Sequence, residues 1–231
     1  MLSNRLAYSG FSLVEMMISM VLGSTLFLLV SDAYVKSTVS IAKLQQIKHL
    51  DAQLNDITSL MSKEIKRAGF VNYNVDVAER YISQYRFSMA LNGNNYKSPF
   101  YISDDGQCVV FFYDTNKNGC VGDINNSQCV LNLPSNVDFV GYKFDRGQLK
   151  YSPSNTSGCG AGYWSSMIDP TLIKIEKFSA TITGVNPVLS ADQTTKLNFP
   201  VVSIYVKASS VKDKNIKRDV TKLITLESPM L

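Results

Sequence analysis

The stretch Gly10–Ser31, GFSLVEMMISMVLGSTLFLLVS, carries a single ionisable side chain, Glu15, in an otherwise apolar and small-residue run. A helix rises about 1.5 Å per residue, so residues 11–31 are long enough to cross a hydrocarbon core about 30 Å thick. The stretch therefore predicts a membrane-spanning helix. A carboxylate inside hydrocarbon is costly when it is unpaired, so Glu15 calls for a partner.

The flanks of this stretch indicate how the chain crosses the membrane. The leading segment, residues 1–10, carries one basic residue, Arg5, and no small-x-small cleavage site follows the apolar run. We therefore expect the span to be retained. A basic residue before it and a long polar remainder behind it predict a cytoplasmic N-terminus and a C-terminal domain outside.

The helical pattern continues past the membrane. No proline occurs before Pro99, and Gly23 is the only glycine within residues 11–68, so one helix can run from Phe11 to about Ala68. Apolar positions in its outer half recur every three or four residues: Ile47, Leu50, Leu54, Ile57, Met61, Ile65 and Ala68. This amphipathic half must pack on another element, and Gly69 suits a C-terminal cap.

From residue 70 onward the chain consists of short β-rich runs separated by turn residues. In the run PVVSIYVKA, Val202, Ile204 and Val206 alternate with residues of the opposite face, as in a half-buried antiparallel strand. The apolar face of such a sheet needs a cover, and the amphipathic half of the helix is available. The predicted class is α+β, with a long N-terminal helix packed on a C-terminal antiparallel β-sheet domain.

The positions of Gly10, Phe11 and Glu15 match the type III signal of type IV prepilins, whose leader ends in glycine before a phenylalanine, with glutamate as the fifth mature residue. The stretch GFSLVEMMISMVLG and the later LMSKEIKRAGF resemble PilW-type minor pilins, relatives of the type II secretion pseudopilin J group. Two departures are Ser12, where threonine is commoner, and the single basic residue of the leader.

The resemblance implies a type IV pilin fold with four parts. These parts are a leader at 1–10, the transmembrane half of the helix at 11–31, its amphipathic half at 32–69, and a periplasmic globular domain at 70–231. A prepilin peptidase would cut between Gly10 and Phe11 and methylate the new amine of Phe11. The protein would be held in the inner membrane until it is assembled into a cell-surface pilus. Its expected partners are other minor pilins, the major pilin and a candidate tip adhesin.

The resemblance also gives Glu15 a role in subunit assembly. In a bundle of staggered parallel helices, the carboxylate of one subunit can meet the positive α-amino group of a neighbour. The alternative is that Glu15 reaches the lipid head groups alone. Two other functions stay open. A pseudopilin of a type II secretion system fits the same motif, whereas a signal-anchored periplasmic binding module explains the span but not the motif.

The four cysteines are expected to form disulfides in the oxidising periplasm. None are spaced as CxxC and the single histidine, His49, lies far away on the helix, which disfavours zinc. Three pairings are open. We favour Cys120 with Cys129, which flank a short turn-rich loop, and Cys108 with Cys159, which would join SGCGAGYW to the strand CVVFFY.

The segment DTNKNGCVGDIN partly matches a calcium-binding loop. Asp114, Asn116, Asn118 and Gly119 occupy its first, third, fifth and sixth positions, but Asn125 stands where a bidentate glutamate is needed. Asparagine and glycine also favour an ordinary hairpin turn, which is the preferred interpretation. We expect no metal and no cofactor.

The basic run KASSVKDKNIKR, residues 207–218, can attract phosphates, but Asp213 and Asp219 dilute its charge and no aromatic side chain interleaves it. A solvated hairpin is the preferred interpretation, so no nucleic-acid partner is predicted. No pairing of a nucleophile with His49 is visible in the sequence, so we expect no catalytic residues and no enzyme activity.

Overall fold

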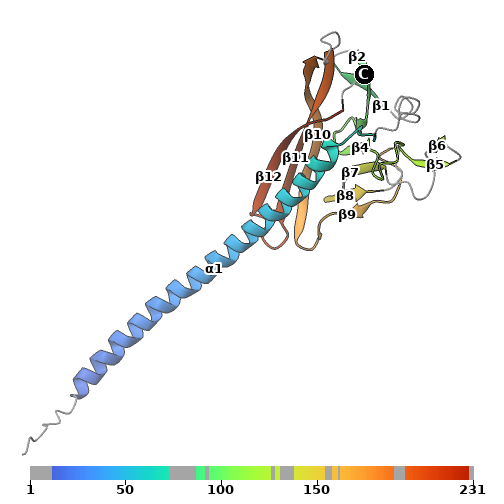
Figure 1. Cartoon of the computed structure of the whole chain (residues 1–231). Helices are drawn as coiled ribbons and strands as arrows, with labels where there is room; N and C mark the ends of the chain where they lie inside the picture. Colours follow the sequence, from blue (N-terminus) through green and yellow to red (C-terminus); the bar gives the residue numbers. More distant parts are fainter. Residues whose placement is uncertain are drawn as a thin grey trace, which may run out of the picture. The chain divides into compact units, whose positions relative to one another are not determined.

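The structure is a computed structural model that describes residues 12–72, 87–91, 94–125, 128–130, 138–153, 158–160, 162–189 and 196–228. These residues form one long helix and twelve strands (Figure 1). The chain divides into two compact units, Met1–Lys48 and His49–Leu231, and the helix belongs partly to each. The two units are described separately.

Helix α1 runs from Leu13 to Lys66, a length of 54 residues. Its C-terminal end has the cap that the sequence indicates. The amide of Ala68 donates to the carbonyl of Ile65 (2.9 Å), and Gly69 adopts a left-handed backbone with φ +82°. A β-carbon at Gly69 would lie 2.6 Å from Ser228 Oγ, so this position requires glycine for its space as well as for its backbone.

The strands of the second unit pair antiparallel throughout the described residues. The five-stranded sheet has the order β3 (Phe100–Ile102), β4 (Cys108–Phe112), β7 (Phe139–Asp145), β8 (Gln148–Ser152) and β9 (Ser165–Ser166). The three-stranded sheet has the order β10 (Ile173–Leu189), β11 (Lys196–Ser210) and β12 (Lys217–Thr225). Two hairpins complete the set, β1 (Phe87–Leu91) with β2 (Asn94–Ser98) and β5 (Asp123–Asn125) with β6 (Gln128–Val130).

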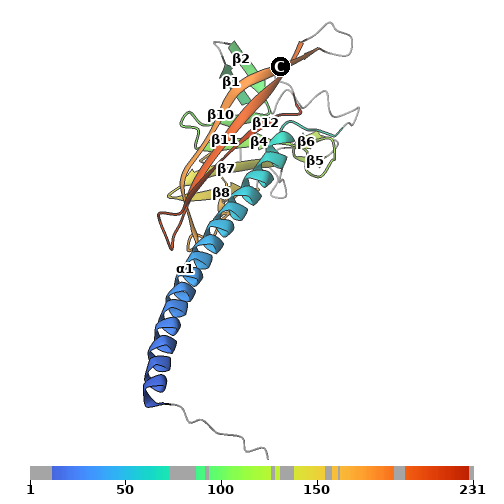
Figure 2. The same ribbon diagram turned by 90° about the vertical axis from the view of Figure 1, so that its left-hand side faces the viewer.

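The core of this unit lies between the C-terminal part of α1 and the sheets (Figures 1 and 2). Six of the seven expected positions are buried, and Ile47 is half-buried; the buried ones are Leu50, Leu54, Ile57, Met61, Ile65 and Ala68. On β11, Val202, Ile204 and Val206 are buried and Ser203, Tyr205 and Lys207 are half-exposed, which confirms the predicted alternation. The fold class is therefore the predicted one, a long N-terminal helix packed on antiparallel sheets.

The two larger sheets meet through backbone hydrogen bonds from β10 to turns of the five-stranded sheet. The amide of Ala180 donates to the carbonyl of Gly106 (2.8 Å), and that of Ile175 donates to the carbonyl of Gly147 (2.9 Å). Gly106 has φ +68°, and a β-carbon there would lie 2.8 Å from the Ala180 carbonyl oxygen. The β3–β4 turn can therefore approach β10 this closely only with glycine at position 106.

Candidate functional site

The processing motif, residues 10–15, overlaps the start of α1. Gly10 and Phe11 lie outside the described residues, and Ser12 is the first residue described. The carbonyl of Ser12 accepts the amide of Met16 (3.1 Å), so helical hydrogen bonding begins directly after the motif. Glu15 lies exposed in the first turn, where the helix dipole favours a negative charge.

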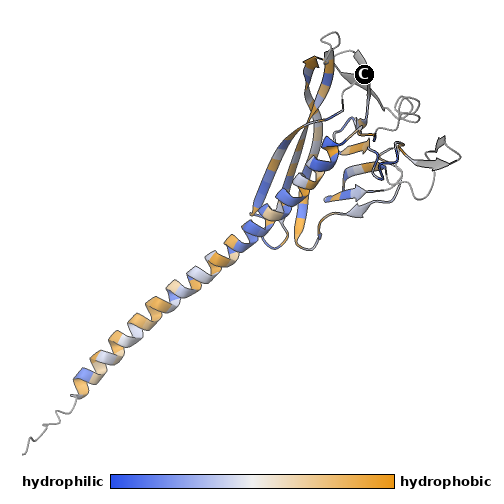
Figure 3. Ribbon diagram, viewed as in Figure 1, coloured by the Kyte–Doolittle hydropathy of each residue, from blue (hydrophilic) through white to orange (hydrophobic). Residues whose placement is uncertain are grey.

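The N-terminal part of α1 exposes large apolar side chains along its length, and the ribbon there is coloured mainly as hydrophobic (Figure 3). Those exposed between residues 13 and 44 are Leu13, Val14, Met16, Met17, Ile18, Met20, Val21, Leu22, Leu26, Phe27, Leu28, Leu29, Val30, Tyr34, Val35, Val39, Ile41 and Leu44. By length and composition, α1 contains a stretch able to cross a membrane. A helix that is apolar all round needs a lipid or protein environment to cover it.

Polar groups within this apolar part form hydrogen bonds with the helix itself. The hydroxyl of Ser19 donates to the carbonyl of Glu15 (2.7 Å), that of Ser24 to Val21 (2.9 Å) and that of Thr25 to Leu22 (2.9 Å). Hydroxyls that are satisfied in this way can enter hydrocarbon without leaving an unpaired donor. The Glu15 carboxylate is therefore the polar group of this part that most needs an outside partner.

Two ion pairs join the C-terminal part of α1 to strand β12 and to the segment that follows β12. Arg218 Nε of β12 lies 3.1 Å from Asp51 Oδ1 of the helix. Lys66 Nζ lies 3.1 Å from Glu227 Oε1, and the Glu227 amide donates to the carbonyl of Lys66 (3.1 Å). The side chains of both ion pairs are partly exposed, so each pair contributes only about 0.2–1 kcal/mol. The apolar contacts of the helix carry most of its attachment.

A carboxylate on α1 also faces an aromatic cluster of the five-stranded sheet. The hydroxyl of Tyr142, on β7, donates a short hydrogen bond to Glu64 Oε2. Burial raises the pKa of the Glu64 carboxyl, against the opposing effects of this bond and of Arg67. Burial and the nearby Glu64 charge raise the pKa of Tyr142 far above its ordinary value, and burial raises that of Tyr151 to about 12.

Sequence reasoning missed this pair, because the two residues lie 78 positions apart and no local pattern links them. The only available signal was the position of Glu64, which lies three residues after Met61 and next to Ile65 on the buried side of the helix. The pair ties α1 to the sheet through a specific polar contact in addition to the apolar face.

The structure joins Cys108, at the start of β4, to Cys159 by a disulfide with Cα atoms 6.1 Å apart. Cys120 is also disulfide-bonded. The side chain of Cys129 lies outside those that the structure describes, so the pairing of Cys120 with Cys129 stays a prediction. His49 is exposed on the helix.

In and around the calcium-like loop, aspartate carboxylates accept hydrogen bonds from backbone amides. Asp114 Oδ2 accepts the amides of Gly119 (2.8 Å) and Asn72 (3.1 Å), and its Oδ1 accepts that of Asn118 (3.1 Å). Asp138 accepts the amides of Thr115 (2.8 Å) and Gly122 (2.6 Å) in the same way. In the residues that the structure describes, no three histidine, cysteine, aspartate or glutamate residues are grouped as metal ligands would be.

The basic run at residues 207–218 forms the end of β11, a turn and the start of β12. Its charge is partly neutralised by neighbouring elements. Lys217 Nζ lies 2.9 Å from Glu176 Oε1, and Arg218 pairs with Asp51 on the helix. These pairs lower the net positive charge of the hairpin, and the absence of a nucleic-acid partner stays a prediction.

The fold, the exposed apolar helix and the processing motif together define a type IV pilin-like protein. Residues 43–226 match the family model of prepilin peptidase-dependent protein B, and residues 5–31 match the prokaryotic N-terminal methylation motif. The first match covers most of the chain, so the protein belongs to the prepilin peptidase-dependent protein B family. Such pilin-like proteins are structural proteins rather than enzymes, and this motif supports membrane anchoring and processing by a prepilin peptidase.

The chain is also similar to individual proteins. An uncharacterised protein of Haemophilus influenzae is 28% identical over 111 residues, and the alignment covers 44% of each protein. The chain thus spans less than half the length of this curated relative. A solved structure, a type IV-like pilin from Thermus thermophilus, aligns with a TM-score of 0.40 at 12% identity and covers 78% of this chain and 96% of its own.

Proposed function

We propose that the protein is a minor pilin, a structural and assembly-priming subunit of a type IV pilus. In this proposal, a prepilin peptidase cuts between Gly10 and Phe11 and methylates the Phe11 amine, and the mature subunit enters the fibre near its tip. One observation carries the proposal. Between residues 12 and 31, helix α1 is apolar or small in every residue except Glu15, which lies in its first turn, and the hydroxyls of Ser19, Ser24 and Thr25 bond to the helix backbone.

The proposed role of Glu15 is to neutralise the terminal amine of a neighbouring subunit. Cleavage after Gly10 would create that positive charge four residues before Glu15 in each subunit. Axially staggered parallel helices can then bring the amine of one chain to the carboxylate of the next. Removing one partner of a charge pair in poorly solvated surroundings typically costs about 3–5 kcal/mol. Exposure to lipid head groups would reduce that cost.

We also propose where the subunit resides before and after assembly. Arg5 ahead of the span favours a cytoplasmic N-terminus, which leaves residues 70–231 in the periplasm while the chain is held in the inner membrane. In the families that the motif resembles, the subunit at the tip commonly lacks the glutamate. Glu15 therefore supports a position below a capping subunit, where the chain bridges that subunit and the major-pilin shaft.

The test is the substitution Glu15→Gln in cells that assemble the fibre. Insertion, cleavage and folding do not need the charge, so the processed protein should reach wild-type levels in the membrane. Its amount in sheared fibres should fall by at least tenfold, because each 1.4 kcal/mol changes an equilibrium tenfold. Both quantities are measured by immunoblot.

Asp32→Asn is the matched control, since it removes a carboxylate from the same helix. Asp32 forms an exposed ion pair with Lys36 (2.7 Å), which contributes a few tenths of a kcal/mol. The Asp32→Asn protein should enter fibres normally. Equal recovery of Glu15→Gln and wild type in fibres would remove the assembly role of Glu15. Loss of its processed membrane form would instead assign the carboxylate to an earlier step.

A further inference from the structure

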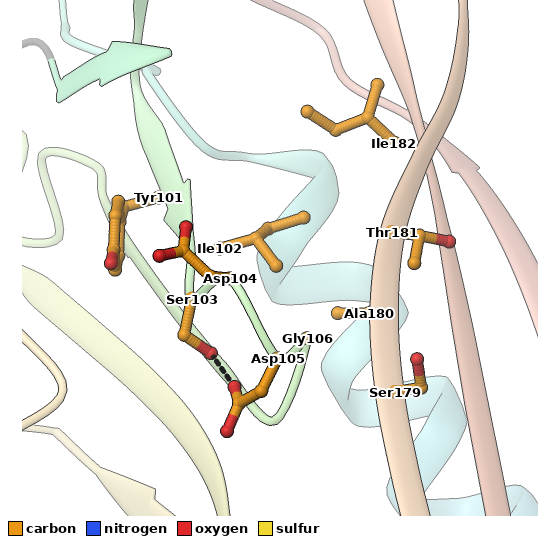
Figure 4. Close-up of a pocket in the computed structure, with 10 residues that line it drawn as sticks. All are labelled: Tyr101, Ile102, Ser103, Asp104, Asp105, Gly106, Ser179, Ala180, Thr181 and Ile182. Carbon is orange, nitrogen blue, oxygen red and sulfur yellow. Dashed lines mark hydrogen bonds between the residues drawn. The ribbon is translucent and has the colours of Figure 1, made fainter. Parts of the chain in front are cut away.

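A pocket of about 390 Å³ lies where the five-stranded and three-stranded sheets approach each other. Two segments line it, residues 101–106 from β3 and the turn behind it and residues 179–182 of β10 (Figure 4). A backbone hydrogen bond from the amide of Ala180 to the carbonyl of Gly106 joins the two lining segments. Both lining strands are edge strands of the sheets that the structure describes.

The backbone of β3 presents polar groups to this pocket. Antiparallel pairing with β4 uses the carbonyl of Pro99, which accepts the amide of Phe112, and the amide of Ser103, which donates to the carbonyl of Cys108. Backbone groups alternate in direction along a strand, so Phe100 and Ile102 point theirs away from β4. The Phe100 amide already donates to Ser98 Oγ (3.3 Å). Ile102 therefore offers its amide and carbonyl at the outer edge.

The backbone of β10 presents a second set of polar groups. The amide of Ala180 points away from β11, because it donates to Gly106 across the junction of the sheets. Pairing with β11 is regular from Lys177 to Ile182, and the next register shift lies between Ile182 and Gly184. The amide and carbonyl of Ile182 therefore lie on the same free edge as those of Ala180, next to the pocket.

Both apolar and polar side chains line the pocket, and the β3–β4 turn beside it carries acidic ones. Ile102 and Ile182 extend from the two strands toward the space between them (Figure 4). Asp104 and Asp105 are exposed in the β3–β4 turn. Asp105 Oδ1 accepts hydrogen bonds from Ser103 Oγ (2.6 Å) and the Gln107 amide (2.9 Å), so Asp105 shapes the turn while Asp104 projects from it. The acidic turn favours a positively charged ligand.

We propose that this pocket binds an extended, lysine- or arginine-containing segment of a partner protein, which adds as a strand to the free edge of β10 at Ile182. Main-chain hydrogen bonds would supply the affinity. Ile102 and Ile182 would contact the apolar side chains of the segment, and Asp104 would attract its basic residue. The pocket lies wholly within residues 49–231, so this inference does not depend on the role proposed for the apolar helix.

The test uses the full chain in detergent micelles and three fluorescein-labelled heptapeptides, measured by fluorescence anisotropy. The peptide TVKVKVT can form a basic strand, TVEVEVT reverses its charge, and TVPVPVT lacks two of its amide donors. We expect saturable binding of TVKVKVT, at least tenfold weaker binding of TVEVEVT, and no saturable binding of TVPVPVT. Equal binding of all three peptides, or of none, would overturn the proposal.

Paired substitutions locate the binding site on the protein. Ile182→Pro removes the edge amide, and an edge strand tolerates proline, as β10 already does at Pro187. It should abolish peptide binding, whereas Ile182→Ala keeps the amide and should weaken binding less. Asp104→Lys should weaken TVKVKVT binding about tenfold. Asp219→Lys, which makes the same change in net charge on exposed β12, should leave binding unchanged.

The emission of the single tryptophan, Trp164, reports whether each variant keeps its fold. If Ile182→Pro changes this emission, the fold of that variant is altered and its loss of binding does not locate the site. The comparison of Asp104→Lys with Asp219→Lys then tests the location, because both residues are exposed and their replacement should leave the fold intact. Peptide binding that responds to neither Asp104→Lys nor Ile182→Pro would contradict the assigned site.

Discussion

The two parts of helix α1 share one backbone and differ in what covers them. From Leu13 to Leu44 the helix exposes all its large apolar side chains; for example, Leu28 is 66% exposed. From Leu50 to Ile65 one face is fully covered, and Leu54 is 0% exposed. The first part therefore requires a lipid or protein environment to cover it, whereas the second already has its partner within the chain. The pattern of apolar and polar side chains, rather than helix propensity, determines which part of the helix packs within the chain and which part does not.

The largest expected effect on the stability of the second part concerns the disulfide between Cys108 and Cys159. It closes a loop of about 51 residues, so replacing both cysteines by serine should lower the free energy of unfolding by about 4 kcal/mol. Denaturant unfolding followed by Trp164 emission checks this value in full-length protein. The helical signal of the apolar part in micelles should not change. If that signal fell as well, the two parts would not be independent.

A matched pair of leucine substitutions contrasts the two parts of the helix directly. Leu54→Ala removes a fully buried side chain and should cost about 2–5 kcal/mol of unfolding free energy. Leu28→Ala makes the same chemical change where the side chain is exposed and should cost less than about 0.5 kcal/mol. Both values come from the same denaturant experiment. Equal losses of unfolding free energy would contradict the difference in packing between the two parts of the helix.

A smaller effect than that of Leu54→Ala is expected at Glu64 and Tyr142. Tyr142→Phe removes the donor to a half-buried carboxylate and should cost about 1–3 kcal/mol. Because burial raises the folded-state pKa of Glu64, the stabilising contribution of its protonated form is complete below about pH 4.5. That contribution is lost as the pH rises through the folded-state pKa. The stability of wild type relative to Glu64→Gln should therefore fall as the pH rises above about 4.5. A constant difference would show that Glu64 is not perturbed.

Much of the fold could be predicted because its signals are local. The apolar run, the spacing of Leu50, Leu54 and Ile57, and the alternation of Val202 and Ile204 each depend on neighbouring residues. The C-terminal cap at Gly69 follows from the same kind of local signal, as does the family resemblance from the motif at Gly10.

The parts that could not be predicted depend on contacts between distant residues. The Glu64–Tyr142 pair and the approach of Gly106 to Ala180 join segments far apart in the chain. The division of the strands into a five-stranded and a three-stranded sheet has the same origin, because a strand pattern gives the spacing of side chains but not the neighbouring strand. The pocket between the sheets was therefore also beyond sequence reasoning.

The central claim is that the apolar part of α1 is released from its leader and enters a fibre. The intact mass of the protein, extracted from membranes and from sheared fibres, tests it most directly, with Gly10→Leu as the uncleaved control. The account predicts a chain of residues 11–231 carrying one methyl group in both fractions, and a full-length Gly10→Leu precursor found only in the membrane. A wild-type protein that retains Met1 in assembled fibres would contradict the account.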